Sequence, residues 1–157
     1  MSDNDVIGAV LDQFRRALRM FRETIIAFPP DEWHRGDIDY LRPAGVAYHV
    51  IESIDFYTGN QPPDKFSWGA RFGVDWENKH SDRLPSQGQL TTYLDEVEDK
   101  LQEWFEKTDL LAAETTYPWT GSLVLARAIY ILRNIQHHLS EMSLELTRRG
   151  YQSPEWL

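Results

Sequence analysis

The stretch that decides the fold is residues 7–28, IGAVLDQFRRALRMFRETIIAF. Its large apolar residues recur with the spacing 4-3-4-3-4-3, which matches the period of an α-helix with one apolar face. They are Ile7, Leu11, Phe14, Leu18, Phe21, Ile25 and Phe28. Pro29 and Pro30 follow at once and end the helix, because proline lacks an amide donor and clashes with the preceding turn. The stretch therefore predicts a long amphipathic helix with a buried face.

Two further helices are indicated by their end residues. The second begins at Pro43, since proline is favoured in a first turn, and is expected to run to Gly59 as its C-cap. The third opens at Ser86, where Gln89 three residues later completes a capping-box pattern.

A fourth helix is expected near the carboxyl end of the chain. Ser122 is its predicted N-cap, and it ends at Arg148-Arg149-Gly150, where cations in the last turn precede a glycine. No segment alternates polar and apolar residues convincingly with a period of two, so we expect no strands.

The four helices predict an all-α fold, a four-helix bundle that forms a single domain over residues 1–157. The connectors are Pro29–Arg42, Asn60–Pro85 and Asp109–Gly121, and all exceed the roughly 2–8 residues usual between bundle helices. The middle connector, between the second and third helices, is long enough to be a crossover, a lid or a pocket wall.

The middle connector also carries four large rings, Phe66, Trp68, Phe72 and Trp76. A solvated linker would not carry such residues. They can pack over one end of the core, or they can line a pocket or form a dimer contact. The two interpretations are compatible.

Composition and charge exclude several classes of function. Lys and Arg number 16 against 25 Asp and Glu, a net charge of −9, which argues against binding to nucleic acid. The absence of cysteine excludes disulfides, thiolate nucleophiles and iron–sulfur clusters, so any metal must be held by His, carboxylate or amide groups. The acidic start of the chain and the lack of a window of about 20 apolar residues predict no signal peptide, no membrane span and a cytoplasmic location.

Two histidines interrupt the apolar faces of different helices. His49 lies on the second helix, and His138 lies on the fourth, with Asn134 one turn before it on the same face. A His from one helix and an i, i+4 pair from another is an arrangement by which bundles hold a metal and leave a position open for water or substrate. Neutral imidazole suits Zn, Ni or Fe, whereas the amide oxygen of Asn134 is a harder donor. The alternative is a hydrogen-bonded polar cluster within the core.

Residues 133–143, RNIQHHLSEMS, and residues 48–57, YHVIESIDFY, resemble the fourth-helix and second-helix motifs of the DinB/YfiT-like proteins, and residues 72–76, FGVDW, resemble one branch of them. The resemblance implies a four-helix bundle, often a homodimer, with a divalent metal held by three histidines near one end. Members of known activity are transferases and isomerases that use low-molecular-weight thiols. Carried over, the triad is His49, Asn134 and His138, and it departs from the family at Asn134, where the family has histidine.

Other residues can supply the ligand that Asn134 replaces. They are Glu141, His137 and Glu52. The alternative is that Glu141 and Glu52 are solvated or paired with arginine and that His137 lies at the surface. Residues expected around a pocket are Trp68, Phe72, Trp76 and Arg133. Arg133, like Arg42 and Arg71, can bind an anionic cofactor at the mouth of a pocket or form a surface salt bridge.

Two functional hypotheses follow. The first is a divalent-metal-dependent transferase or hydrolase that activates a small thiol or water, since the chain has no cysteine of its own. The second is a non-catalytic module, with a degenerate metal site, that binds a small molecule or acts in a dimer. Asn134 favours the second hypothesis, and retention of both His49 and His138 favours the first.

Overall fold

The computed structural model describes residues 3–59, 61–77 and 83–157. The long helices are α1 (Asp3–Ala27), α2 (Pro43–Tyr57), α3 (Gln87–Lys107) and α4 (Val124–Arg148). Short 3-10 helices lie in the connectors, at Asp39–Leu41, Pro63–Lys65 and Pro118–Thr120. Within the described residues there is no strand, only an isolated bridge between Ala113 and Leu123. The predicted all-α fold with four helices is confirmed.

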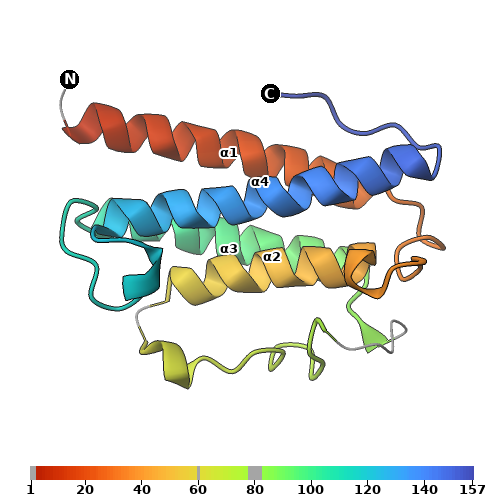
Figure 1. Cartoon of the computed structure of the whole chain (residues 1–157), viewed down its shortest axis with the longest axis horizontal. Coiled ribbons are helices and arrows are strands. Elements are labelled where there is room, and N and C mark those ends of the chain that lie inside the picture. Colours follow the sequence, from red (N-terminus) through yellow and green to blue (C-terminus); the bar gives the residue numbers. More distant parts are fainter. Residues whose placement is uncertain (1–2, 60, 78–82) are drawn as a thin grey trace.

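The helices form a bundle in which α1 and α2 lie on opposite corners, each packed against α3 and α4. The helices α1 and α4 run in one direction along the bundle, and α2 and α3 run in the other (Figure 1). Because α2 and α3 are parallel, the chain between them returns along the bundle on the outer side of α2 (Figure 1). The crossover predicted between these helices is confirmed. None of the helices in the described part of the chain is long and apolar enough to cross a bilayer.

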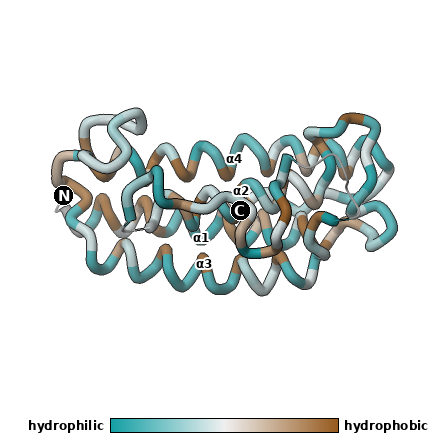
Figure 2. The backbone as a smooth tube through the Cα atoms, turned by 90° about the horizontal axis from the view of Figure 1, so that it is seen from below, coloured by the Kyte–Doolittle hydropathy of each residue, from teal (hydrophilic) through white to brown (hydrophobic). Residues whose placement is uncertain are grey.

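The core lies between the four helices and is formed by the predicted apolar faces. Along α1, α3 and α4, hydrophobic and hydrophilic positions alternate at intervals of about one turn (Figure 2), whereas α2 is buried over most of its length. In α1, the stripe is fully buried over its second half, whereas Ile7 and Leu11 are only partly buried. Buried members of the stripe are Phe14, Leu18, Phe21, Ile25 and, just past the helix, Phe28.

The helix ends confirm one predicted cap and correct two others. Ser86 and Gln89 form the expected capping box at the start of α3. At α4 the prediction was wrong: the N-cap is Leu123, with no side-chain cap. The carbonyl of Ser122 accepts the Glu114 N–H at 3.0 Å, and this pairing keeps the chain extended for one residue more. The second helix ends at Tyr57, and its C-cap is Thr58 rather than Gly59.

The carboxyl end of α4 is held by a hydrogen-bonded turn and an ion-pair network. Gly150 adopts a φ of +84°, and the Tyr151 N–H reaches the Leu146 carbonyl at 2.9 Å, as in a Schellman motif. Arg148 and Arg149 both bind the Glu145 carboxylate, at distances from 2.7 to 2.9 Å. The Arg149 guanidinium also reaches across to the first connector.

We predict that Glu145 stabilises the fold only above acidic pH. The hydrogen bonds from Arg148, with those from Arg149, lower the pKa of Glu145 from 4.5 to about 2. As the pH falls, Glu145 is therefore protonated in the unfolded chain before it is protonated in the folded protein. Its contribution to the unfolding free energy is complete above about pH 4.5 and is lost as the pH falls towards 2. Replacing Glu145 with Gln should lower the unfolding free energy at pH 7 by about 1–3 kcal/mol and flatten its acid dependence. Urea unfolding between pH 2.5 and 7 measures this. The exposed carboxylate of Glu23 is the control, and an equal effect of Glu23→Gln would contradict the assignment.

Candidate functional site

His49 and His138 meet where α2 packs against α4. Their ring centroids lie 4.8 Å apart with the rings nearly perpendicular. The indole of Trp76, from the crossover, lies against His49 with a centroid distance of 4.2 Å. Both histidines are partly buried. The fold therefore brings together two of the predicted metal ligands and one of the predicted pocket residues, from three separate segments.

His49 is neutral and lacks a hydrogen-bond partner in the described structure. Its Nδ1 atom is buried and unpaired. Burial, and then the neighbouring His138, lower the pKa of His49 to about 4. An imidazole that stays neutral at pH 7 keeps a lone pair, and this is the form that binds metals.

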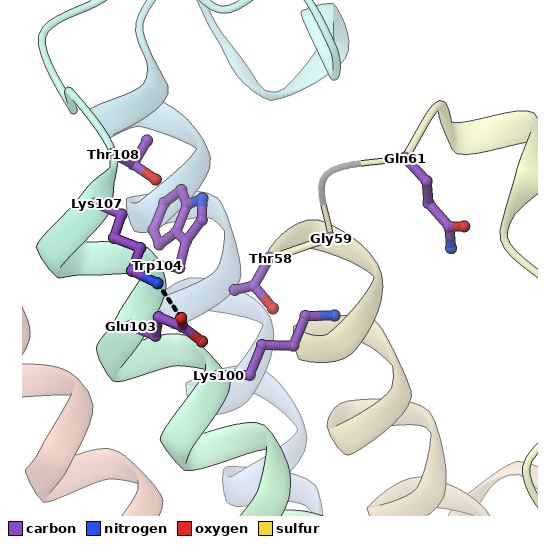
Figure 3. Close-up of a pocket in the computed structure, with 8 residues that line it drawn as sticks. All are labelled: Thr58, Gly59, Gln61, Lys100, Glu103, Trp104, Lys107 and Thr108. Carbon is purple, nitrogen blue, oxygen red and sulfur yellow. Dashed lines mark hydrogen bonds and ion pairs between the residues drawn. The ribbon is translucent and has the colours of Figure 1, made fainter.

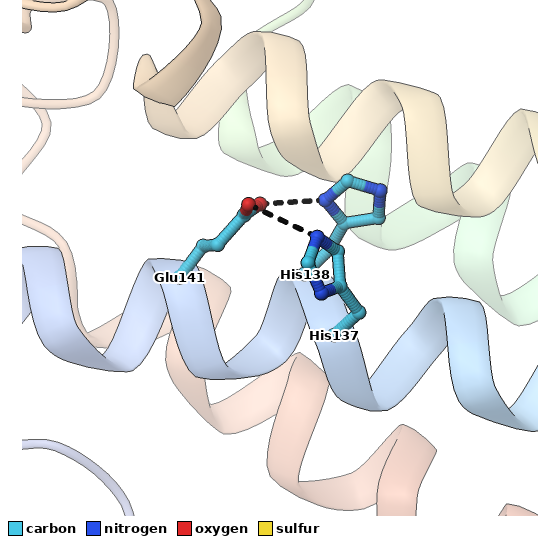
Figure 4. Close-up of side chains that lie close together, drawn as sticks. All are labelled: His137, His138 and Glu141. Carbon is cyan, nitrogen blue, oxygen red and sulfur yellow. Dashed lines mark hydrogen bonds and ion pairs between the residues drawn. The ribbon is translucent and has the colours of Figure 1, made fainter.

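His138 is oriented by a carboxylate on its own helix. Its Nδ1 lies 2.7 Å from Oε2 of Glu141, and Oε1 of the same carboxylate lies 3.2 Å from Nε2 of His137 (Figure 4). In the tautomer in which the Nδ1–H of His138 donates a hydrogen bond to Glu141, the Nε2 atom carries the lone pair that can bind a metal. The potential ligand atoms of these three residues also lie within 4.8 Å of one another. The cluster thus offers two modes of metal binding, one between α2 and α4 and one along α4 alone.

Asn134, the remaining residue of the predicted triad, lies one turn before His138 and is partly buried. Its Nδ2 is buried and has no hydrogen-bond partner among the residues that the structure describes. The residue also lines a cleft of about 510 Å³ on the outer side of α4. The other lining residues are Tyr130, Arg133, Gln136 and His137. Asn134 therefore lies between the histidine pair and this cleft.

Glu52 takes a different place from the one expected of a metal ligand. It is 2% exposed, and its Oε1 accepts the Gly69 N–H at 2.6 Å. Gly69 has a φ of +75°, and a Cβ there would lie 2.7 Å from the Val74 carbonyl oxygen. The glycine thus permits a turn that a larger residue would strain, and Glu52 holds that turn against α2.

Of the remaining predicted pocket residues, Trp68 and Phe72 pack on α2 away from the pair His49 and His138. Trp68 is 42% exposed and packs on Phe56 at a centroid distance of 4.9 Å. Phe72 packs edge-on against Tyr48 at 5.4 Å. These two rings attach the crossover to α2, so only Trp76 among the connector rings contacts the histidine pair. Arg133 is exposed at the cleft on α4.

A second cleft of about 450 Å³ lies between the carboxyl ends of α2 and α3 (Figure 3). Lys100 and Lys107 contribute to it, each paired with a carboxylate, Asp55 and Glu103 respectively. The seven-residue spacing of the lysines indicates a shared helix face, but sequence reasoning did not single it out. Tyr130 and Gln136, in the cleft on α4, were also missed, although both follow the helical spacing of Arg133 and Asn134.

In comparisons with known proteins, no family model matches the chain, and no curated protein matches it.

We predict that Glu52 destabilises the fold when it ionises. Burial raises the pKa of Glu52 from 4.5 to about 7, although the Gly69 N–H lowers it in part. The folded protein therefore retains a proton that the unfolded chain has lost, and the unfolding free energy falls as the pH rises from about 4.5 to 7. In Glu52→Gln, the amide oxygen can still accept the Gly69 N–H without a buried charge.

The variant should show a smaller loss of stability across this range, by roughly 1–3 kcal/mol. Denaturant unfolding at pH 5 and pH 8 measures the difference. The exposed Glu155→Gln serves as control, and a Glu52→Gln profile parallel to that of the unmodified protein would contradict the prediction.

Proposed function

We propose that this chain is a DinB-like protein that holds a divalent metal ion between α2 and α4 and activates a small thiol or water, as a transferase or hydrolase. The observation that carries the proposal is the pairing of His49 and His138. Their rings lie 4.8 Å apart on two helices, and a buried Nδ1 on one of them has no partner. Two facing imidazoles with free lone pairs are ligands suited to Zn, Ni or Fe(II).

The residues present fit such an ion. The imidazoles of His49 and His138 and the side-chain amide of Asn134 form the donor set, and the amide would bind an ion through its oxygen, Oδ1. A buried polar atom without a partner costs about 1–3 kcal/mol. His49 and Asn134 each bury one such atom in the described structure. A bound ion would remove the cost at Nδ1 of His49, whereas Nδ2 of Asn134, a donor, requires an acceptor such as water.

The surrounding residues orient and shield the pair. A divalent ion supplies Lewis acidity, which lowers the pKa of a bound thiol or water. Glu141 fixes the ring of His138 by accepting from its Nδ1. Trp76 covers one face of His49 and excludes water from it. Since the chain has no cysteine, the nucleophile comes from the ligand or from solvent.

One observation favours the non-catalytic alternative. Glu141 contacts both His137 and His138, so this cluster is internally satisfied without an ion. With Asn134 in the position where the resemblance implies histidine, the protein would then serve as a small-molecule-binding or interaction module.

Metal binding by tag-free protein tests the proposal. Chelator-treated protein is loaded with Zn²⁺, and stoichiometry and affinity are measured by elemental analysis and calorimetry. We expect about one ion per chain, lost in His49→Ala and in His138→Ala but retained in His137→Ala. Loss in His137→Ala with retention in His49→Ala would assign the ion to α4 alone and overturn the interhelical site. Sub-stoichiometric zinc in the unmodified protein would overturn the metal proposal itself.

Replacing Asn134 with His provides the complementary gain of function. A third imidazole on the face that carries His138 would complete a three-histidine set, so we expect zinc affinity to rise by about 100-fold or more. Calorimetric titration measures it, with Gln136→His, also on α4, as the control. Equal affinity of Asn134→His and the unmodified protein would show that the helices do not present these positions to one ion.

A further inference from the structure

The cleft on the outer side of α4 is lined by hydrogen-bond donors. Its volume is about 510 Å³, and the lining residues that the structure describes all lie on α4. They are Tyr130, Arg133, Asn134, Gln136 and His137. Each of these side chains can donate a hydrogen bond, through a hydroxyl, a guanidinium, an amide or a ring N–H.

The charge of this lining departs from that of the whole chain. Asp and Glu outnumber Lys and Arg by 25 to 16 in the sequence, yet none of the described residues that line the cleft is acidic. The carboxylate of Glu141, which is not among these lining residues, lies 3.2 Å from Nε2 of His137. The cleft is therefore a local exception in an acidic protein, and a guanidinium is its one permanent charge.

Arg133 has no ion pair or hydrogen bond to another described residue, although it is exposed beside the cleft. The lysines of the cleft in Figure 3 differ, since Lys100 and Lys107 each bind a carboxylate. Most other arginines of the bundle are paired in the same way; Arg71, for example, binds Glu96. The guanidinium of Arg133 thus keeps its planar donor fork available for a ligand.

We propose that this cleft binds a small molecule bearing an oxyanion, a carboxylate or a phosphate, with Arg133 as the anchoring residue. A guanidinium matches either group through two parallel N–H···O bonds. The amide of Gln136 and the hydroxyl of Tyr130 are further donors for the same ligand.

The position of Asn134 connects the cleft with the histidine pair. Arg133 and His137 are four residues apart, about 6 Å along the helix axis. A ligand anchored at Arg133 and long enough to span one helical turn along α4 would reach His137. The inference deepens the proposed function. It rests on that function only for the contact between the ligand and the histidine cluster, because the contact between the oxyanion and Arg133 requires no metal.

Titration of the chelator-treated, full-length protein with inorganic phosphate and, separately, with succinate tests the cleft. Two-dimensional NMR follows the Arg133 Nε–H and the side-chain amides of Asn134 and Gln136. We expect saturable shifts at these groups with at least one of the probes. A response to one probe alone identifies which oxyanion the cleft prefers. Shifts with neither probe, or shifts spread over the surface, would overturn the proposal.

Substitutions at Arg133 separate a specific contact from general charge. Arg133→Gln should weaken oxyanion binding about tenfold or more, since it removes charge-assisted hydrogen bonds. The affinity of Arg133→Lys should lie between those of Arg133→Gln and the unmodified protein, because lysine keeps the charge but lacks the planar guanidinium group. The control is Arg35→Gln, an exposed arginine in the first connector. Equal losses in Arg133→Gln and Arg35→Gln would show that only net charge matters and would overturn the proposal. Thermal unfolding verifies that each variant is folded.

Repeating the titration with and without Zn²⁺ distinguishes this inference from the proposed function. Oxyanion binding lost in Arg133→Gln, in a protein that takes up no zinc, would support the cleft and contradict the metal site. Zinc binding with no response to phosphate or succinate would support the metal site and contradict the cleft.

Discussion

The parallel direction of α2 and α3 is the constraint on which the rest of the structure depends. A chain that leaves one end of the bundle must begin α3 at the other end, so the crossover runs back along α2 (Figure 1). It contacts α2 in reverse order, with Gly69 at Glu52 and then Trp76 at His49. The same topology that requires a long connector therefore also delivers an indole to the histidine pair.

The contact that joins the crossover to α2 includes an ionisable group, the carboxyl of Glu52. Glu52 is buried where it receives the Gly69 N–H, and burial raises the pKa of its carboxyl group. At the far end of the bundle, Glu145 is held ionised by Arg148 and Arg149. The two carboxylates respond to pH in opposite directions because one is buried with few donors and the other is surrounded by guanidinium groups. The strength of the crossover contact is thereby coupled to proton uptake.

The histidine pair between α2 and α4 and the cleft on the outer side of α4 are adjacent along α4. Asn134 belongs to both, since it lies one turn from His138 and lines the cleft with Arg133. A ligand in the cleft would bring a charged group to the guanidinium and its other end to the imidazoles.

Much of the fold followed from the sequence alone, because helix periodicity and end residues are local properties. The stripe in residues 7–28, the proline pair after it and the capping box at Ser86 each act within a few residues of chain. The cap expected at Ser122 failed because a distant partner, Glu114, holds that segment extended. Local signals therefore determine helices and their ends, except where a non-local hydrogen bond competes.

For the site, the sequence determined which residues had to be explained, namely the polar residues His49, Asn134 and His138 on apolar faces. Only the tertiary structure decided their neighbours. It turned Glu52 to the crossover and placed Trp76 on His49, because those contacts depend on helix direction and on the register between crossover and α2. Spacing along one helix is set by its pitch, whereas contacts between segments are set by how the whole bundle packs.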